Sequence, residues 1–174
     1  VNEKTGDISL FLMETTTVNG YLLNDEFKVV KSLSSDDKSR KYKMLIGKSI
    51  SNKNDYRIYL TNNKQNKFAS INFSYSNNSS SLEEFELASK NELLVQTLTH
   101  NNQFFLISII KNSSTLCLYK FDNEGKYERI VLDFSSEIFL NRTGSNTTLF
   151  KLCTENTGAY GLKKSIDVKK IEKN

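Results

Sequence analysis

Short hydrophobic runs separated by polar turns are the dominant pattern of this chain. The runs are rich in Ile, Val, Leu, Phe and Tyr, and Asn, Ser, Asp and Gly fill the turns between them. Short apolar runs bounded by turn-forming residues are typical of β-strands. No segment keeps the helical period over several turns. The pattern therefore predicts an all-β protein.

The expected strands recur at a nearly constant spacing, since runs opening at residues 8, 56 and 104 lie 48 residues apart. The first series of strands is 8–13, 56–60 and 104–110, the second is 20–23, 68–75 and 115–121, and the third is 27–33, 82–87 and 127–134. Opening strands precede two of these sets, at residues 42–50 and 92–99. The first set has no opening strand, so the first antiparallel unit is expected to be one strand short.

A short motif repeats in step with this spacing. Residues 21–26 read Y-L-L-N-D-E, residues 119–124 read Y-K-F-D-N-E, and the offset of 98 residues is about twice the strand period. A degraded copy lies between them at residues 71–80. A repeat of this length indicates four-stranded antiparallel units of about 48 residues, the period expected of propeller blades. The single β domain then divides into units at roughly 6–37, 42–89, 91–136 and 137–174.

The last unit departs from the regular pattern. It is expected to hold four shorter strands, at residues 138–140, 147–152, 159–162 and 165–171. Pairing of the last of these with the first unit would supply the missing opening strand and close a ring.

The most blade-like stretch is residues 116–127, L-C-L-Y-K-F-D-N-E-G-K-Y. Over about residues 6–136 the chain resembles a divergent β-propeller repeat protein. It has no Gly-His or Trp-Asp pair, no double Gly followed by Tyr and Trp, and no Asp-box ending in Trp, so it matches no named blade family. The resemblance therefore implies an architecture and carries over no functional residues. A packed β-sandwich is the alternative fold.

Individual segments carry more local predictions. Asn101-Asn102 is expected to form a hairpin turn, because Asn tolerates positive φ, and Gly125 is expected at the left-handed position of the next turn. Residues 81–89 are interpreted as a strand, with a short helix as the alternative. Residues 104–110 (F-F-L-I-S-I-I) do not alternate, which predicts a strand buried on both faces.

Composition and charge narrow the class of protein. The chain has 174 residues, 37% of them hydrophobic, which suits one folded domain. The net charge of +4 is mild, and no basic stripe with interleaved aromatic residues is present, which argues against nucleic-acid binding. No apolar stretch reaches the roughly 18–20 residues of a membrane span. A soluble protein is expected, with a secreted or periplasmic location favoured and the oligomeric state open.

Metal and cofactor sites are not predicted. Cys117 and Cys153 lie in apolar runs, where a free cysteine is a small hydrophobe, although one bridge between neighbouring units is an alternative. The single histidine, His100, has no neighbouring ligand at metal-site spacing and no serine elbow to serve. Gly47-Lys48-Ser49 resembles the end of a phosphate loop, but Tyr42 stands where that loop needs Gly, so a strand is favoured.

The sequence favours a non-catalytic binding or scaffolding module for a protein or glycan ligand. Turns on one face are the expected contact points, with candidates at Asp55, His100, Asn102 and Glu155. The acidic turns at residues 24–26 and 122–124 are interpreted as turn-forming Asx residues rather than calcium loops. A carbohydrate-active hydrolase with carboxylates gathered from several units, among them Asp122 and Glu124, is the alternative. A segment of a longer propeller without separate function is another.

Overall fold

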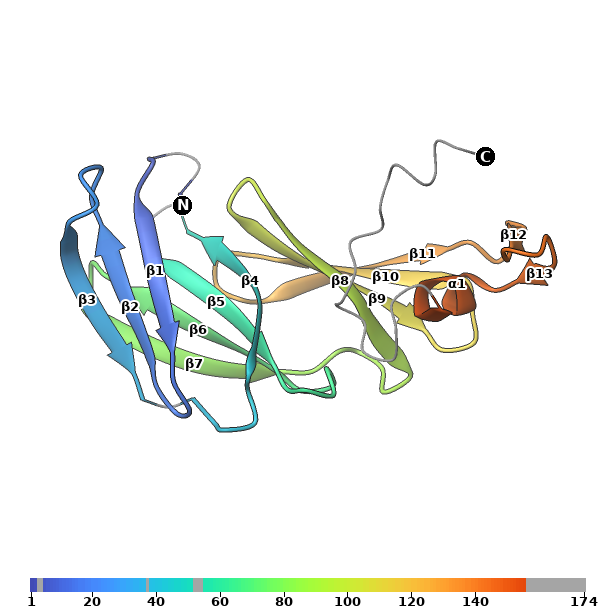
Figure 1. Ribbon diagram of the computed structural model, residues 1–174, viewed down its shortest axis with the longest axis horizontal. Coiled ribbons are helices and arrows are strands. Elements are labelled where there is room, and N and C mark those ends of the chain that lie inside the picture. The colour runs from blue at the N-terminus through green and yellow to red at the C-terminus, as the bar shows by residue number, and fades with distance from the viewer. Residues whose placement is uncertain (3–4, 37, 52–54, 156–174) are drawn as a thin grey trace. The chain divides into compact units, whose positions relative to one another are not determined.

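The computed structural model describes residues 1–2, 5–36, 38–51 and 55–155, and it confirms the all-β prediction (Figure 1). The described residues form four antiparallel sheets and one short helix, and none of these sheets closes on itself. The chain separates into two compact units. Unit 1 comprises Val1–Leu87, Thr97–Phe105 and Lys120–Glu128, and unit 2 comprises Ala88–Gln96, Leu106–Tyr119 and the chain from Arg129 on.

Two sheets make up most of unit 1. The first contains three strands in the order β1-β2-β3, and the second contains four in the order β4-β5-β6-β7. Their bounds are Ile8–Met13 (β1), Val18–Leu23 (β2), Val29–Ser35 (β3), Met44–Ile50 (β4), Tyr56–Thr61 (β5), Phe68–Ser74 (β6) and Ser79–Phe85 (β7). Among the described residues the first sheet has three strands and the second has four, and β7 confirms a strand over the first part of residues 81–89.

The four-stranded sheet of unit 1 is covered on both faces. On one face, Ile58, Ile71 and Phe73 form a core with Phe11 of the first sheet, whose ring lies 5.0 Å from that of Phe73. On the other face, Tyr59 stacks on Phe104 at 4.0 Å between ring centroids. Every residue of β5 is consequently buried. Face-to-face packing of this kind keeps apolar side chains away from water on both faces of the four-stranded sheet.

This arrangement corrects one sequence prediction. The strand expected to be buried on both faces was 104–110, but β9 alternates between buried and half-buried positions. The described strands that are buried on both faces are β5 and β6, and their buried residues include the polar Arg57 and Ser70. Arg57 is tolerated there because its Nη1 donates to Ser70 Oγ at 2.8 Å and to Glu83 Oε2 at 2.9 Å.

The third sheet has the strand order β11-β10-β9-β8, and each of its strands contributes residues to both units. The strands are Glu92–His100 (β8), Gln103–Ile110 (β9), Thr115–Phe121 (β10) and Tyr127–Asp133 (β11). Its turns form as predicted. Asn101 and Asn102 have φ of 49° and 62°, and Gly125 has φ of 86°. The side chain of Asp122 accepts from the backbone N–H groups of Glu124 and Lys126, both at 2.9 Å, so this acidic turn is an Asx turn.

The C-terminal part of unit 2 differs from the prediction. It contains two short strands, Phe139–Leu140 (β12) and Asn146–Thr147 (β13), followed by the helix Leu149–Glu155 (α1). The strand expected at residues 147–152 is therefore wrong, because Thr148 caps a helix instead. The Thr148 hydroxyl accepts from the Lys151 N–H at 3.2 Å. The strands expected at 159–162 and 165–171 lie outside the described residues, and no disulfide joins Cys117 to Cys153.

Candidate functional site

Strand β4 lies at one edge of its sheet, yet its outward backbone groups have hydrogen-bond partners. The Thr97 hydroxyl donates to the Ile46 carbonyl at 2.5 Å, and the Thr99 hydroxyl donates to the Lys48 carbonyl at 2.9 Å. The Ile50 N–H donates to the Asn102 carbonyl at 2.9 Å. These partners belong to residues 97–102, which are part of unit 1. The hydroxyls of Thr97 and Thr99 are two residues apart, which matches the spacing of the outward carbonyls of Ile46 and Lys48 on the edge of β4.

Strand β1 is also an edge strand, and its outward groups face a different environment. The Glu14 N–H donates to the Thr17 carbonyl at the end of the β1–β2 hairpin. Alternation along an antiparallel ladder then directs the N–H and C=O groups of Ser9, Phe11 and Met13 away from β2. Within the part of the chain that the structure describes, no strand pairs with this second edge of β1.

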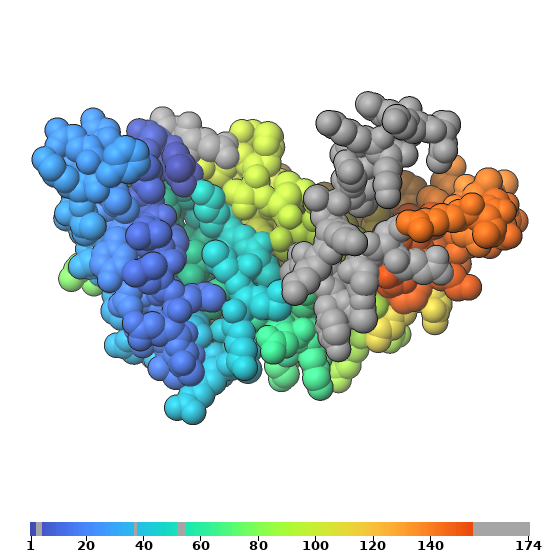
Figure 2. Space-filling model, viewed as in Figure 1, coloured from blue at the N-terminus to red at the C-terminus, as the bar shows by residue number. Residues whose placement is uncertain are grey.

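A groove of about 490 Å³ runs between β1 and β4 over the surface of β5. It lies entirely in unit 1 and is lined by Val1, Ser9, Leu10, Phe11, Leu45, Gly47, Lys48, Tyr56, Ile58 and Thr99. We call it the β1–β4 groove. Leu10 and Leu45 on its two sides are 48% and 53% exposed. Both strands reach the visible face of the molecule in Figure 2. The groove therefore offers apolar walls to solvent beside the outer edge of β1.

One cationic side chain and one phenol provide most of the polar character of the β1–β4 groove. Lys48 Nζ donates to the Val1 carbonyl at 3.3 Å. Burial, aided by the charge of Asp7, raises the pKa of Tyr56 to about 12, so this phenol is neutral at pH 7. The Tyr56 hydroxyl donates to the Asp7 carbonyl at 3.4 Å. Among the described residues that line the groove, a ligand would meet hydrocarbon, a neutral phenol, the hydroxyls of Ser9 and Thr99, and the ammonium group of Lys48.

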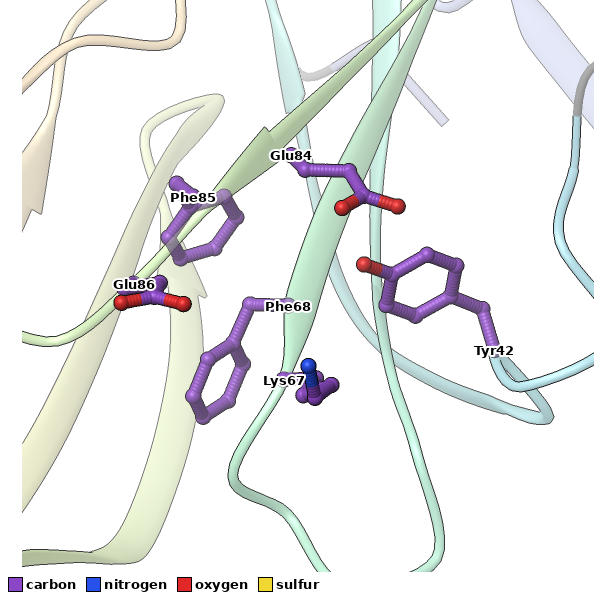
Figure 3. A pocket seen from close by; sticks show the side chains of 6 residues that line it. All are labelled: Tyr42, Lys67, Phe68, Glu84, Phe85 and Glu86. Atoms are coloured by element: carbon purple, nitrogen blue, oxygen red, sulfur yellow. The ribbon is translucent and has the colours of Figure 1, made fainter. Parts of the chain in front are cut away.

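A second pocket of unit 1, about 280 Å³ in volume, is smaller and more polar (Figure 3). Its lining residues are Tyr42, Lys67, Phe68, Glu84, Phe85 and Glu86. Lys41 Nζ lies 2.8 Å from Glu84 Oε1, and the hydrogen bond between them lowers the pKa of the Glu84 carboxyl. Glu84 therefore stays ionised at neutral pH. A general acid for glycoside hydrolysis needs the opposite shift, so Glu84 is not suited to that role.

Unit 2 contains a buried polar cluster around Glu92. One carboxylate oxygen of Glu92 accepts from the Ser108 and Tyr119 hydroxyls, each at 2.6 Å, and the other accepts from Arg129 Nη2 at 2.8 Å. Arg129 Nη2 also lies 3.0 Å from Cys117 Sγ. Burial raises the pKa of the Cys117 thiol and so keeps it protonated. Since both oxygens of the carboxylate have partners, the cluster cross-links four strands rather than presenting a ligand site.

The sequence-predicted turn residues lie in different places. Asn102 is buried, and its Nδ2 donates to Asn2 Oδ1 at 2.8 Å while its carbonyl accepts from the Ile50 N–H. Asp55 is half-buried at the start of β5, and its N–H donates to Ser51 Oγ at 3.2 Å. The structure thus brings Asn102 to the end of β4, in the same unit as Asp55.

His100 and Glu155 complete the predicted set. His100 is exposed at the end of β8, with its Nε2 3.1 Å from Asn101 Nδ2. Glu155 ends α1 in unit 2, and its side chain lies outside the described residues. The residues lining the β1–β4 groove are absent from this set. The signal that pointed to them was the missing opening strand, which leaves one side of β1 without a neighbour.

Among residues 1–2, 5–36, 38–51 and 55–155, no three His, Cys, Asp or Glu side chains are arranged to hold a metal ion. In the same part of the chain no helix is long and apolar enough to span a membrane. Comparison of the chain with protein-family models, with curated proteins and with solved structures gives no match.

Proposed function

We propose that this protein is a non-catalytic binding or scaffolding module whose ligand is another polypeptide. The observation that carries the proposal is the β1–β4 groove, an apolar hollow of about 490 Å³ with exposed leucines on both sides. Its volume lies within the range of about 300–1,000 Å³ that is usual for ligand pockets. Exposed apolar surface of this kind is stabilised when a partner covers it.

The chemistry of the groove favours a polypeptide over a glycan. Leu10, Phe11, Leu45 and Ile58 supply hydrocarbon surface, which matches apolar side chains. A sugar ring needs several directed donors and acceptors for its hydroxyls, because a buried hydroxyl without a partner is costly. Among the described side chains that line the groove, Lys48 is the one cation, and it suits a carboxylate or a backbone carbonyl of the ligand.

For the architecture we propose a propeller-like series of repeated units, with a β-sandwich as the alternative. The support is positional. β1, β5 and β9 begin at residues 8, 56 and 103, close to the 48-residue spacing of the sequence pattern. In unit 1, sheets lie face to face with aromatic residues between them, as in stacked blades or a sandwich. Repeat architectures of this kind serve more often in binding than in catalysis, which agrees with the proposed role.

The alternative of a carbohydrate-active hydrolase has less support. Asp122 uses its side chain to accept from two backbone N–H groups of its own turn. Glu124 pairs with Lys126 at 2.9 Å, and that hydrogen bond lowers its pKa. Both carboxylates are thus engaged locally, and the lowered pKa keeps that of Glu124 ionised at neutral pH. A glycosidase acid needs a raised pKa and a partner carboxylate at a defined separation, and no observation on these two residues favours that role.

A selection from a phage-displayed library of random 12-residue peptides, with the full chain as bait, tests the proposal. Selected peptides are compared on the wild type, on Leu45→Glu in the groove, and on Val131→Glu as a control. Leu45 and Val131 are similarly exposed, at 53% and 50%, and Val131 belongs to unit 2. We expect groove-dependent peptides to lose about tenfold or more in affinity on Leu45→Glu and to be unaffected by Val131→Glu. A selection that gives no peptide sensitive to Leu45→Glu would contradict the proposed function.

A further inference from the structure

The three large sheets differ in the strand that lies beside β1, β5 and β9, the strands that recur about every 48 residues. β4 occupies the outer side of β5, and β8 occupies the outer side of β9. β1 holds the corresponding position in the three-stranded sheet, and no described strand lies on its outer side. In the described part of the chain, the first sheet therefore has no strand at the edge where its two counterparts have one.

The backbone of β1 is arranged to accept such a strand. In β5, the residue Thr61 directs its carbonyl toward the β4 side, where it accepts from the Lys43 N–H at 3.1 Å. Because the backbone groups alternate along a strand, the N–H and C=O groups of Arg57 and Tyr59 also face β4. Ser9, Phe11 and Met13 occupy the matching places in β1, at the same positions from the start of the strand. Their N–H and C=O groups can therefore pair with an added strand in the way that those of β5 pair with β4.

The β1–β4 groove lies where the side chains of an added strand would go. Ser9 and Phe11 line it from β1, and Tyr56 and Ile58 line it from the sheet beneath. Side chains of an added strand opposite Ser9 and Phe11 would point to the same face of the first sheet and so enter the groove. Its volume of about 490 Å³ accommodates more than one large apolar side chain.

The positive charge of Lys48 favours an added strand that carries an acidic side chain. Lys48 Nζ reaches the groove and now donates to the Val1 carbonyl at the rather long distance of 3.3 Å. A carboxylate on the incoming segment would be a stronger partner for this ammonium group. On the opposite side, β4 itself does not compete for the added strand, because Thr97, Thr99 and Asn102 occupy its outward groups.

From these observations we infer that the chain binds an extended segment of another polypeptide by strand addition to the open edge of β1. The segment runs antiparallel to β1, places alternate apolar side chains in the β1–β4 groove, and carries an acidic group near Lys48. The inference rests on the proposed function and specifies its partner. Main-chain hydrogen bonds to β1 supply affinity, and the groove supplies selectivity for side chains.

A synthetic peptide with the sequence of β8, residues 92–100 (E-L-L-V-Q-T-L-T-H), is the first probe. This strand fills the corresponding place beside β9, and it carries both an acidic residue and alternating side chains. The same peptide with Val95→Pro is its control, because proline cannot donate to a ladder. Amide hydrogen exchange of the full chain is followed by nuclear magnetic resonance with and without peptide. We expect the amides of Ser9, Phe11 and Met13 to exchange quickly alone and about tenfold or more slowly with the peptide, and the proline peptide to have no effect.

Two variants of the protein locate the effect. Met13→Pro removes one outward N–H of β1, and Ser32→Pro removes one on the far edge of the same sheet, where alternation directs the Ser32 N–H away from β2. Both side chains are exposed. We expect Met13→Pro to weaken peptide binding about threefold to tenfold, as loss of one hydrogen bond implies, and Ser32→Pro to leave it unchanged.

The other outcomes each overturn the inference. Amides of Ser9, Phe11 and Met13 that are already protected without peptide would show that the chain's own residues cover this edge. Peptides from the phage selection that depend on Leu45 but protect none of these amides would leave the proposed function standing and remove strand addition. The inference also fails if neither the β8 peptide nor any selected peptide protects them.

Discussion

Two edge strands of unit 1, β1 and β4, lie in different surroundings. The outward groups of β4 meet the hydroxyls of Thr97 and Thr99 and the carbonyl of Asn102. The outward groups of β1 meet no strand among the described residues and border an apolar groove. Sheet edges are templates for association, and proteins usually cover or charge them. Within the described residues, specific side chains thus cover one edge, and no strand covers the other.

The difference also shows how side chains can replace a strand. Threonines at alternate positions present hydroxyls about every two residues, which equals the period of outward groups on an edge. Ile46 lies at the point where the register of β4 shifts against β5, and its carbonyl would be left unpaired without Thr97. Covering of this kind stabilises the edge without extending the sheet. Substitutions at the covered edge and at the open edge, each with a matched control, test this difference.

The largest effect is expected from Gly47→Val on the covered side. An added Cβ at Gly47 would overlap the ring of Phe104, which is fully buried and stacked on Tyr59. The ring must move from a packed core, at a cost of about 3 kcal/mol in the free energy of unfolding. Leu45→Val in the same strand is the control, since Leu45 is 53% exposed and should change stability by less than about 0.5 kcal/mol. Urea unfolding measures both, and equal effects would contradict the packing of Phe104 on β4.

Removing the hydroxyls that cover β4 is expected to have the next largest effect. Thr99→Val leaves the Lys48 carbonyl without its donor and should cost about 1 kcal/mol, and adding Thr97→Val should roughly double that. Thr16→Val, at an exposed turn position, provides the matched control. Thermal or urea unfolding gives the comparison. If the double variant were as stable as the Thr16→Val protein, the hydroxyls would have no part in covering this edge.

The two faces of β5 should contribute equally to alkaline unfolding. Burial raises the pKa of Tyr56, on the groove face, and of Tyr59, on the covered face, from 10.0 to about 12. Between these values the unfolded chain loses the phenolic proton while the folded chain keeps it. Each tyrosine therefore adds stability that is present below pH 10 and is lost as pH rises toward 12.

Replacing either tyrosine with phenylalanine removes its contribution. In urea unfolding from pH 9 to pH 11, Tyr56→Phe and Tyr59→Phe should each show a shallower loss of stability above pH 10 than the wild type. A slope that is unchanged in the Tyr56→Phe protein alone would mean that the groove face of β5 is more open to water than the geometry indicates.

The smallest change in stability is expected at the open edge. Met13→Pro removes an N–H that pairs with no described strand, and the side chain it replaces is 38% exposed. Proline is tolerated at such edge positions, so the free energy of unfolding should change by less than about 1 kcal/mol. Thermal unfolding is the measurement. A loss of several kcal/mol would show that the Met13 N–H has a partner in the folded protein.

The sequence predicted strands well because local signals determine them. Alternating runs, Asn101-Asn102 and Gly125 fix hairpins through backbone preferences that need no tertiary context. Counting those runs also predicted the three described strands of the first sheet and the four of the second. The helix α1 was missed, since a seven-residue segment rich in apolar residues reads equally as a strand, and only the cap at Thr148 decides it.

Features that depend on residues far apart could not be predicted. Burial of β5 on both faces needs Phe11 on one side and Phe104 on the other, and nothing in the run Y-R-I-Y-L-T shows either. Asn102 was chosen as an exposed turn residue, yet the structure buries it against Asn2, a hundred positions away. The groove has the same origin, because it arises where β1 and β4 approach over β5. Candidate sites on such surfaces emerge only from the assembled fold.

Native-state hydrogen exchange of the full chain tests the central claim most directly. The amide of Ile50 donates to Asn102 on the covered edge of β4, and the amide of Phe11 points to the open edge of β1. We expect slow exchange at Ile50, close to the rate of global unfolding, and exchange at Phe11 that is faster by about a hundredfold or more. Equal protection of the two amides would contradict the account, because β1 would then be covered as β4 is.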